Sequence, residues 1–121
     1  MDSANTPDAR LSIASEYVIN LFAQNYEAAY SLCTSTIRQS VTPERAAAGR
    51  ALYIKNWGDF KGITGSEEQH FSKPNGVFDG YSLQCEFEDG IKTIDIVFDH
   101  EPRQNEIYSI EIPDDQEFQI D

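Results

Sequence analysis

Basic side chains are scarce in this sequence. Nine Lys and Arg stand against 21 Asp and Glu, which gives a formal net charge of -12. The imbalance lies in residues 61–121, with fifteen acids and four bases, whereas residues 1–60 carry six acids and five bases. A surface of this sign repels phosphate, and no basic cluster offsets it, so nucleic acids and anionic membranes are disfavoured as partners. The acid excess favours solubility, with a basic protein partner as the alternative.

Cysteine and histidine are also few. Cys33 and Cys85 fit no metal-binding spacing and are too few for a disulfide framework, so we expect buried free thiols; a single disulfide is the alternative. His70 falls in a predicted strand, where it should be exposed, and His100 in an acidic loop. The chain also lacks a glycine-rich phosphate loop. The sequence therefore predicts no metal, no cofactor and no catalytic residue.

Long hydrophobic runs are missing as well. No stretch approaches the length of a membrane span, and the first residues lack the basic start and apolar run of a signal peptide. A cytoplasmic location follows if Met1 is the native start, and an exported one if a signal peptide was removed, so the location stays open.

What the chain does have is enough apolar material for one folded domain. It has 121 residues, of which 40% are hydrophobic and 12% aromatic. A chain of this size can bury a core without disulfides or metals. We expect a flexible N-terminus over 1–7, a single domain over 8–112 and an acidic tail over 113–121.

Three helices are predicted in the first half. Apolar residues recur at steps of three and four from Asp8 to Phe22, after a start signal at Thr6 and Pro7. A second stripe runs from Tyr26 to Ile37. The third helix should run from Pro43 to about Asn56, with Thr42 as its cap.

After Gly65 the apolar period falls from about 3.6 to 2, which indicates strands. Predicted strands are Ser66 to Lys73, Tyr81 to Glu88, Ile91 to Phe98 and Glu106 to Ile112, with Asp89-Gly90 as a hairpin turn. Tyr108, Ile110 and Ile112 should face inward, and Asp95 and Val97 outward. The sequence thus predicts an α+β domain in which three N-terminal helices pack on a curved four-stranded antiparallel sheet, shaped like a cone.

Several short segments carry a family resemblance: "NYEAAYSL", "VTPERA", a Trp before "GDFKGI", and "IDIVFD". Over residues 10–112 the chain resembles the nuclear transport factor 2-like (cystatin-like) superfamily, and within it a bacterial family of unknown function sometimes found ahead of α/β-hydrolase domains. The resemblance implies a cone that often encloses a pocket. A tetratricopeptide repeat is excluded because no second copy of the unit follows.

The pocket implied by the resemblance would be lined by aromatic side chains. They could instead simply fill the core. The candidate ligand-binding residues are Tyr17, Tyr30, Tyr53, Trp57, Phe60 and Tyr81.

We expect a non-enzymatic domain that binds a small apolar ligand or another protein. It could form a homodimer through the polar outer sheet face, which carries Gln84, Glu86, Asp95, Ser109 and Glu111. One alternative is an isomerase- or hydratase-like enzyme that uses the tyrosines as donors, and it requires a buried carboxylate or histidine beside them. Another is an acidic inhibitor or immunity protein for a basic partner.

Overall fold

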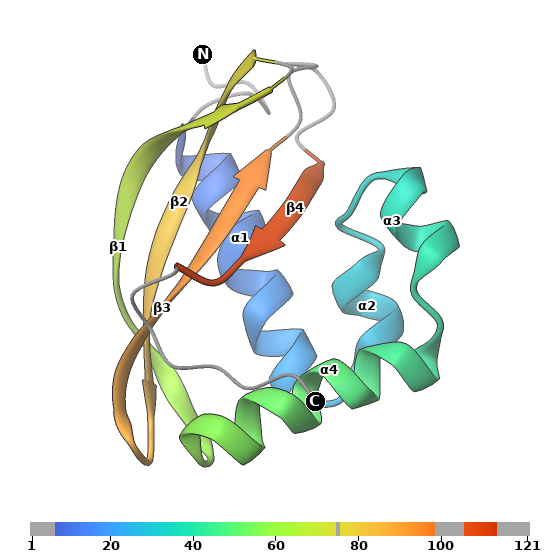
Figure 1. Ribbon diagram of the computed structural model, residues 1–121, viewed down its shortest axis with the longest axis vertical. Helices are drawn as coiled ribbons and strands as arrows, with labels where there is room; N and C mark the ends of the chain where they lie inside the picture. Colours follow the sequence, from blue (N-terminus) through green and yellow to red (C-terminus); the bar gives the residue numbers. More distant parts are fainter. Residues whose placement is uncertain (1–6, 75, 99–105, 114–121) are drawn as a thin grey trace.

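The computed structural model describes residues 7–74, 76–98 and 106–113 and shows an α+β fold (Figure 1). Four helices come first and an antiparallel sheet of order β1-β2-β3-β4 follows. The predicted fold class, helices packed on a curved four-stranded sheet, is confirmed. The elements are α1 (Pro7–Phe22), α2 (Tyr26–Tyr30), α3 (Ser35–Ser40), α4 (Pro43–Trp57), β1 (Phe60–Lys73), β2 (Gly76–Phe87), β3 (Gly90–Phe98) and β4 (Ile107–Glu111).

In Figure 1, α1 lies between the sheet and the pair α2 and α3, while α4 runs across one end of the molecule. The predicted cap at Thr6, most of the predicted N-terminal segment and acidic tail, and His100 lie outside the described residues. None of the described helices is long and apolar enough to cross a membrane.

Helix α4 begins and ends as its sequence predicts. The Thr42 hydroxyl accepts a hydrogen bond from the Arg45 amide at 3.1 Å, and Pro43 occupies the first turn. This satisfies one of the amides that a helix start leaves without a partner. The helix ends at Trp57, because Gly58 adopts φ 85°, a conformation that glycine tolerates best.

The second predicted helix is broken in the structure. Instead of running from Tyr26 to Ile37, the chain forms α2 and α3 with an extended segment between them. The Thr34 amide donates to the Ile107 carbonyl, and the Ile107 amide donates to the Leu32 carbonyl, both at 3.0 Å. The described part of the chain therefore has four helices rather than three, because pairing with β4 replaces the helical bonds of this segment.

The first three strands start earlier than predicted, β4 starts one residue later, and the turn between β2 and β3 comes one residue sooner. Strand β1 begins at Phe60 rather than Ser66, with register shifts near Gly62 and Gly65 that hide the period of two. The turn between β2 and β3 consists of Glu88 and Asp89, since Phe87 already pairs with Gly90.

The core lies between α1 and the inner face of the sheet. Cys33 and Cys85 are buried within it as free thiols, which confirms that prediction. Each large apolar side chain buried there contributes about 1.5–3 kcal/mol. The buried residues of α1 and the sheet in this core are Ala14, Tyr17, Val18, Leu21, Phe22, Tyr81, Leu83, Cys85, Phe87, Ile94, Ile96, Phe98 and Ile107.

The outer sheet face is not wet throughout, because Val97 is buried although it lies on the face predicted for it, opposite Ile96. Val97 is 0% exposed, and Phe78 nearby is 2% exposed. The Phe78 ring stacks on Tyr108 with centroids 4.6 Å apart, and the Lys73 ammonium pairs with the Glu111 carboxylate. The part of the β1–β2 hairpin around Phe78 thus forms a second apolar cluster with β4. Ile107, rather than Tyr108, is the fully buried residue at the start of β4.

Candidate functional site

Two adjoining hollows lie beside the helices, and only the smaller one reaches the sheet, at β4. They share Tyr30, Val41 and Ala46 as lining residues. The larger hollow has a volume of about 560 Å³ and the smaller one about 360 Å³. The smaller hollow is lined by Tyr17, Leu21, Tyr30, Ile37, Val41, Ala46, Gly49, Arg50, Tyr53, Tyr108, Ser109 and Ile110.

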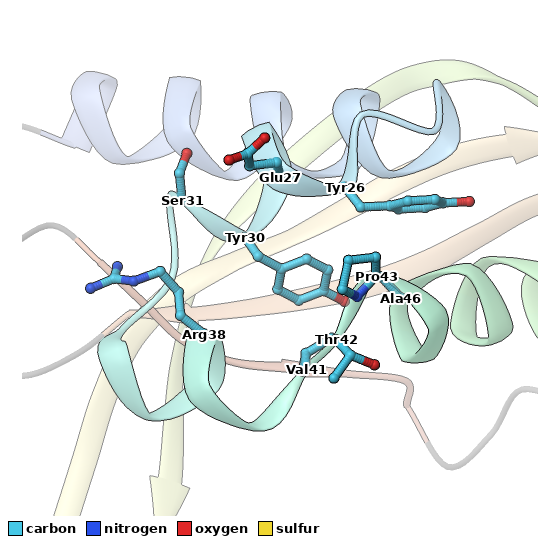
Figure 2. Close-up of a pocket in the computed structure, with 9 residues that line it drawn as sticks. All are labelled: Tyr26, Glu27, Tyr30, Ser31, Arg38, Val41, Thr42, Pro43 and Ala46. Atoms are coloured by element: carbon cyan, nitrogen blue, oxygen red, sulfur yellow. The ribbon is translucent and has the colours of Figure 1, made fainter.

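The larger hollow lies among α2, α3 and the start of α4. Figure 2 shows Tyr30 reaching from α2 toward Val41 and Pro43, while the Arg38 side chain points away from them. The Arg38 guanidinium donates to the Cys33 carbonyl and lies 3.8 Å from the Glu106 carboxylate. Arg38 is exposed and already bound, so the larger hollow offers a ligand no buried charge.

The smaller hollow gathers three tyrosines from three different helices. Tyr17 comes from α1, Tyr30 from α2 and Tyr53 from α4. The Tyr17 hydroxyl donates a hydrogen bond to the Tyr30 hydroxyl at 3.1 Å, and the two rings meet edge to face at 5.5 Å. Three helices thus bring phenol groups together in a lining that is largely apolar apart from Arg50, Tyr108 and Ser109.

These phenols are neutral donors at ordinary pH. Burial raises the pKa of Tyr17 well above 10.0, and the neighbouring Tyr30 and Tyr53 raise it further. Burial likewise raises the pKa of Tyr53. The pKa of Tyr30 is raised by burial, although the hydrogen bond from Tyr17 opposes this. None of the three therefore ionises readily, so each can donate a proton in a hydrogen bond but cannot serve as a general base.

Arg50 also lines the smaller hollow, and the sequence interpretation missed it. It belongs to the inward stripe of α4, four residues after Ala46 and three before Tyr53, so its helical spacing was the available signal. Its Nε donates to the Phe22 carbonyl at 3.2 Å. None of the ion pairs formed within the described residues includes Arg50.

The lack of a side chain at Gly49 leaves open space in the smaller hollow. A Cβ at this position would meet nothing within 4 Å, so the glycine faces open space beside Arg50. Its φ is not in the left-handed region, and a larger side chain can therefore be introduced here without backbone strain.

The other three predicted pocket residues lie in the aromatic core instead of the hollow. Trp57 is 1% exposed, with its ring centroid 5.2 Å from that of Phe87. Phe60 stacks on Phe22 at 4.5 Å. Tyr81 is buried in the same core. The structure thus brings Tyr17, Tyr30 and Tyr53 together and leaves this second group in packing positions.

The described lining of the smaller hollow contains no Asp, Glu or His that could exchange protons beside the tyrosines. His70 lies on the β1–β2 hairpin, exposed, with Nδ1 2.7 Å from the Asp79 carboxylate. Burial raises the pKa of Cys33 to about 12, so this thiol is not a ready nucleophile. Across the described ranges, no three His, Cys, Asp or Glu side chains cluster as a metal site would need.

Comparison with known proteins identifies the family to which the chain belongs. Neither the search of curated proteins nor the search of solved structures returned a match. A family model does match, and it covers residues 14–107, which is most of the chain and runs from the middle of α1 to the first residue of β4. The chain therefore belongs to the family described as "Protein of unknown function (DUF3887)".

Proposed function

We propose that the protein is a non-enzymatic domain that binds a small molecule in the smaller hollow. The observation that carries this proposal is the convergence of Tyr17, Tyr30, Tyr53 and Arg50 on one largely apolar lining. A few polar groups fixed in an apolar concavity are typical of ligand sites, whose volumes run from roughly 300 to 1000 Å³. The hollow, at about 360 Å³, lies at the small end of that range.

Two features favour binding over catalysis. The raised pKa values keep the three phenols neutral, and the described lining offers no carboxylate or imidazole as a partner for proton transfer. Membership of the nuclear transport factor 2-like superfamily is part of the proposal. It is supported by the sequence resemblance and by the way the sheet curves around α1 (Figure 1).

Filling the hollow tests the proposal. Gly49→Leu should project its side chain into the open space, whereas Gly49→Ala adds one methyl group to the same position. We expect saturable binding of a neutral apolar dye, N-phenylnaphthylamine, by the parent chain. Because the added side chain takes the ligand's volume, Gly49→Leu should weaken that binding by about tenfold or more.

Fluorescence titration gives the affinities, and urea unfolding verifies that both variants are folded. Gly49→Ala is the matched control and should bind the dye nearly as well as the parent. Equal affinity in all three proteins would place the dye elsewhere, and absence of saturable binding by the parent would refute the site.

A further inference from the structure

We infer that the ligand of the smaller hollow is a monocarboxylate with an apolar tail, its carboxylate held by Arg50 and Tyr30. This inference rests on the proposed function and names the chemical class that the hollow would take. The experiment below separates failure of the carboxylate assignment from failure of binding itself.

The first step is the state of the Arg50 guanidinium. A guanidinium has five N–H donors, and here only Nε–H has a protein acceptor among the described hydrogen bonds, the Phe22 carbonyl. Burying a cation is costly unless an opposite charge accompanies it. In a chain with 21 acids and nine bases, a half-buried arginine on the inward stripe of α4 with no carboxylate in the described ion pairs is unusual. A ligand anion would supply the opposite charge for the Arg50 guanidinium.

The other arginines of this region show the contrast. Arg38 pairs with Glu106, and Arg45 is exposed and donates to the Ser40 carbonyl at 3.0 Å. Arg50 differs from both because it is half-buried, whereas Arg38 and Arg45 are exposed.

The second step concerns the hydroxyl protons of Tyr17 and Tyr30. The hydrogen bond between the two hydroxyls uses one of their two protons, and the other can be donated to a further acceptor. Since Tyr17 donates to Tyr30, the proton left is that of Tyr30, and no acceptor for it occurs among the described hydrogen bonds. Its raised pKa keeps that proton in place at neutral pH. Tyr30 therefore supplies a neutral donor in the same hollow as the Arg50 cation.

The third step is the match of charge and shape. One planar guanidinium suits one carboxylate, which it can bind through two parallel hydrogen bonds. A dianion such as a phosphate monoester would need a second cation, and Arg50 is the single basic residue in the described lining. The rest of the ligand would contact the apolar side chains of Leu21, Ile37, Val41 and Ile110.

Paired probes of equal size test the inference on the full chain. Octanoate and octanamide differ in charge but have the same number of heavy atoms. We expect the parent protein to bind octanoate about tenfold or more tightly than octanamide in calorimetric titrations, because hydrogen bonds between charged groups are the strong ones. Arg50→Gln should remove this preference while octanamide still binds. Arg45→Gln is the matched control and should keep the preference.

The outcomes are distinguishable. Equal affinity of the parent for both probes, with both lost in Gly49→Leu, would overturn the carboxylate assignment and leave the binding site standing. Binding of neither probe, nor of the neutral dye, would overturn the proposed function. An equal loss in Arg45→Gln would show that overall charge, not Arg50, sets the preference, and would also overturn the inference.

A second variant keeps the test decisive if Arg50→Gln does not fold. Arg50→Lys retains the charge but lacks the planar fork, so the preference for octanoate should fall several-fold without disappearing. An unchanged preference in a folded Arg50→Lys protein would contradict the paired hydrogen bonds on which the inference depends.

Discussion

Gly80 lies where the backbone of β2 has no room for a side chain. A Cβ at this position would lie 2.2 Å from the Ile96 carbonyl oxygen and 2.9 Å from the Phe71 ring. Neither neighbour can give way easily, because one is backbone in the centre of the sheet and the other belongs to the β1–β2 hairpin. We expect Gly80→Ala to lower the free energy of unfolding by about 1–3 kcal/mol, as overpacked sites do.

Gly49→Ala is the matched comparison, because it introduces the same methyl group at a position with open space. Alanine is preferred over glycine inside a helix by roughly 1 kcal/mol, so this variant should unfold at the same or a higher urea concentration than the parent. Urea unfolding of both variants measures the contrast. Equal stability of Gly80→Ala and the parent would show that β2 and β3 can separate at this point without cost.

At the scale of elements, the pairing of Leu32 and Thr34 with β4 holds the helical layer to the sheet edge. Thr34→Pro removes the amide that donates to Ile107, yet Thr34 already has φ -64° and ψ 161°, which proline accepts. The loss should therefore reflect the hydrogen bond, about 0.5–1.5 kcal/mol. The Ile107 amide should also exchange faster with solvent deuterium, because its bond to Leu32 belongs to the same bridge.

Ser35→Pro is the control for this prediction. Ser35 is the first residue of α3, where a missing amide costs little, and the conformation of Thr34 suits a residue before proline. This variant should unfold like the parent. Similar losses in both variants would mean that proline disturbs the segment generally and that the bridge is not what stabilises it.

The elements that the sequence predicts well are those set by local signals. Thr42 and Pro43 define the start of α4 through a cap and a fixed φ, and both act within one helical turn. The break after Tyr30 depends on Ile107, a residue far along the chain, so no local pattern reveals it. Val97 shows the same limit, because alternation gives its side of the sheet but not its burial.

The candidate site was predicted in part for the same reason. Tyr17, Tyr30 and Tyr53 lie on inward helix faces that periodicity locates, and they do line one hollow. Periodicity does not show how deeply a side chain is buried, so Trp57 was predicted to line the pocket although it lies in the aromatic core. Arg50 was overlooked because charged residues usually mark the solvent face of a helix. Only its spacing from Ala46 and Tyr53 indicates that it faces inward.

At the scale of the whole molecule, part of the polar outer face is engaged within the sheet itself. The Ser82 hydroxyl donates to the Asp95 carboxylate at 2.7 Å, and that of Ser109 donates to the Glu111 carboxylate at 2.9 Å. Lys73 also pairs with Glu111. These bonds reduce the polar groups open to a second molecule. A homodimer through this face and a basic protein partner stay predictions.

The folded protein as a whole should lose stability in alkali. Cys33 and Cys85 are 0% exposed, and burial raises the pKa of both thiols to about 12, from 9.0 for an exposed thiol. Between these values the unfolded chain releases protons that the folded protein retains, so the free energy of unfolding falls as pH rises. The stabilisation is complete below about pH 9 and is lost progressively toward about pH 12. Tyr17 and Tyr53, whose pKa values are also raised, add to the loss above pH 10.0.

Cys85→Ala separates the thiol effect from the general repulsion of an acidic chain. Burial is the sole cause of the raised pKa of Cys85, so removing this thiol removes one proton from the linkage. Between about pH 8 and about pH 10.5 the parent should lose about 2 kcal/mol more than the variant, measured by urea unfolding under reducing conditions. The variant will start from a lower stability, since it leaves a small cavity, but the comparison concerns the slope with pH and not the starting value. Parallel curves for the two proteins would mean that the Cys85 thiol ionises as readily in the folded state as in the unfolded one.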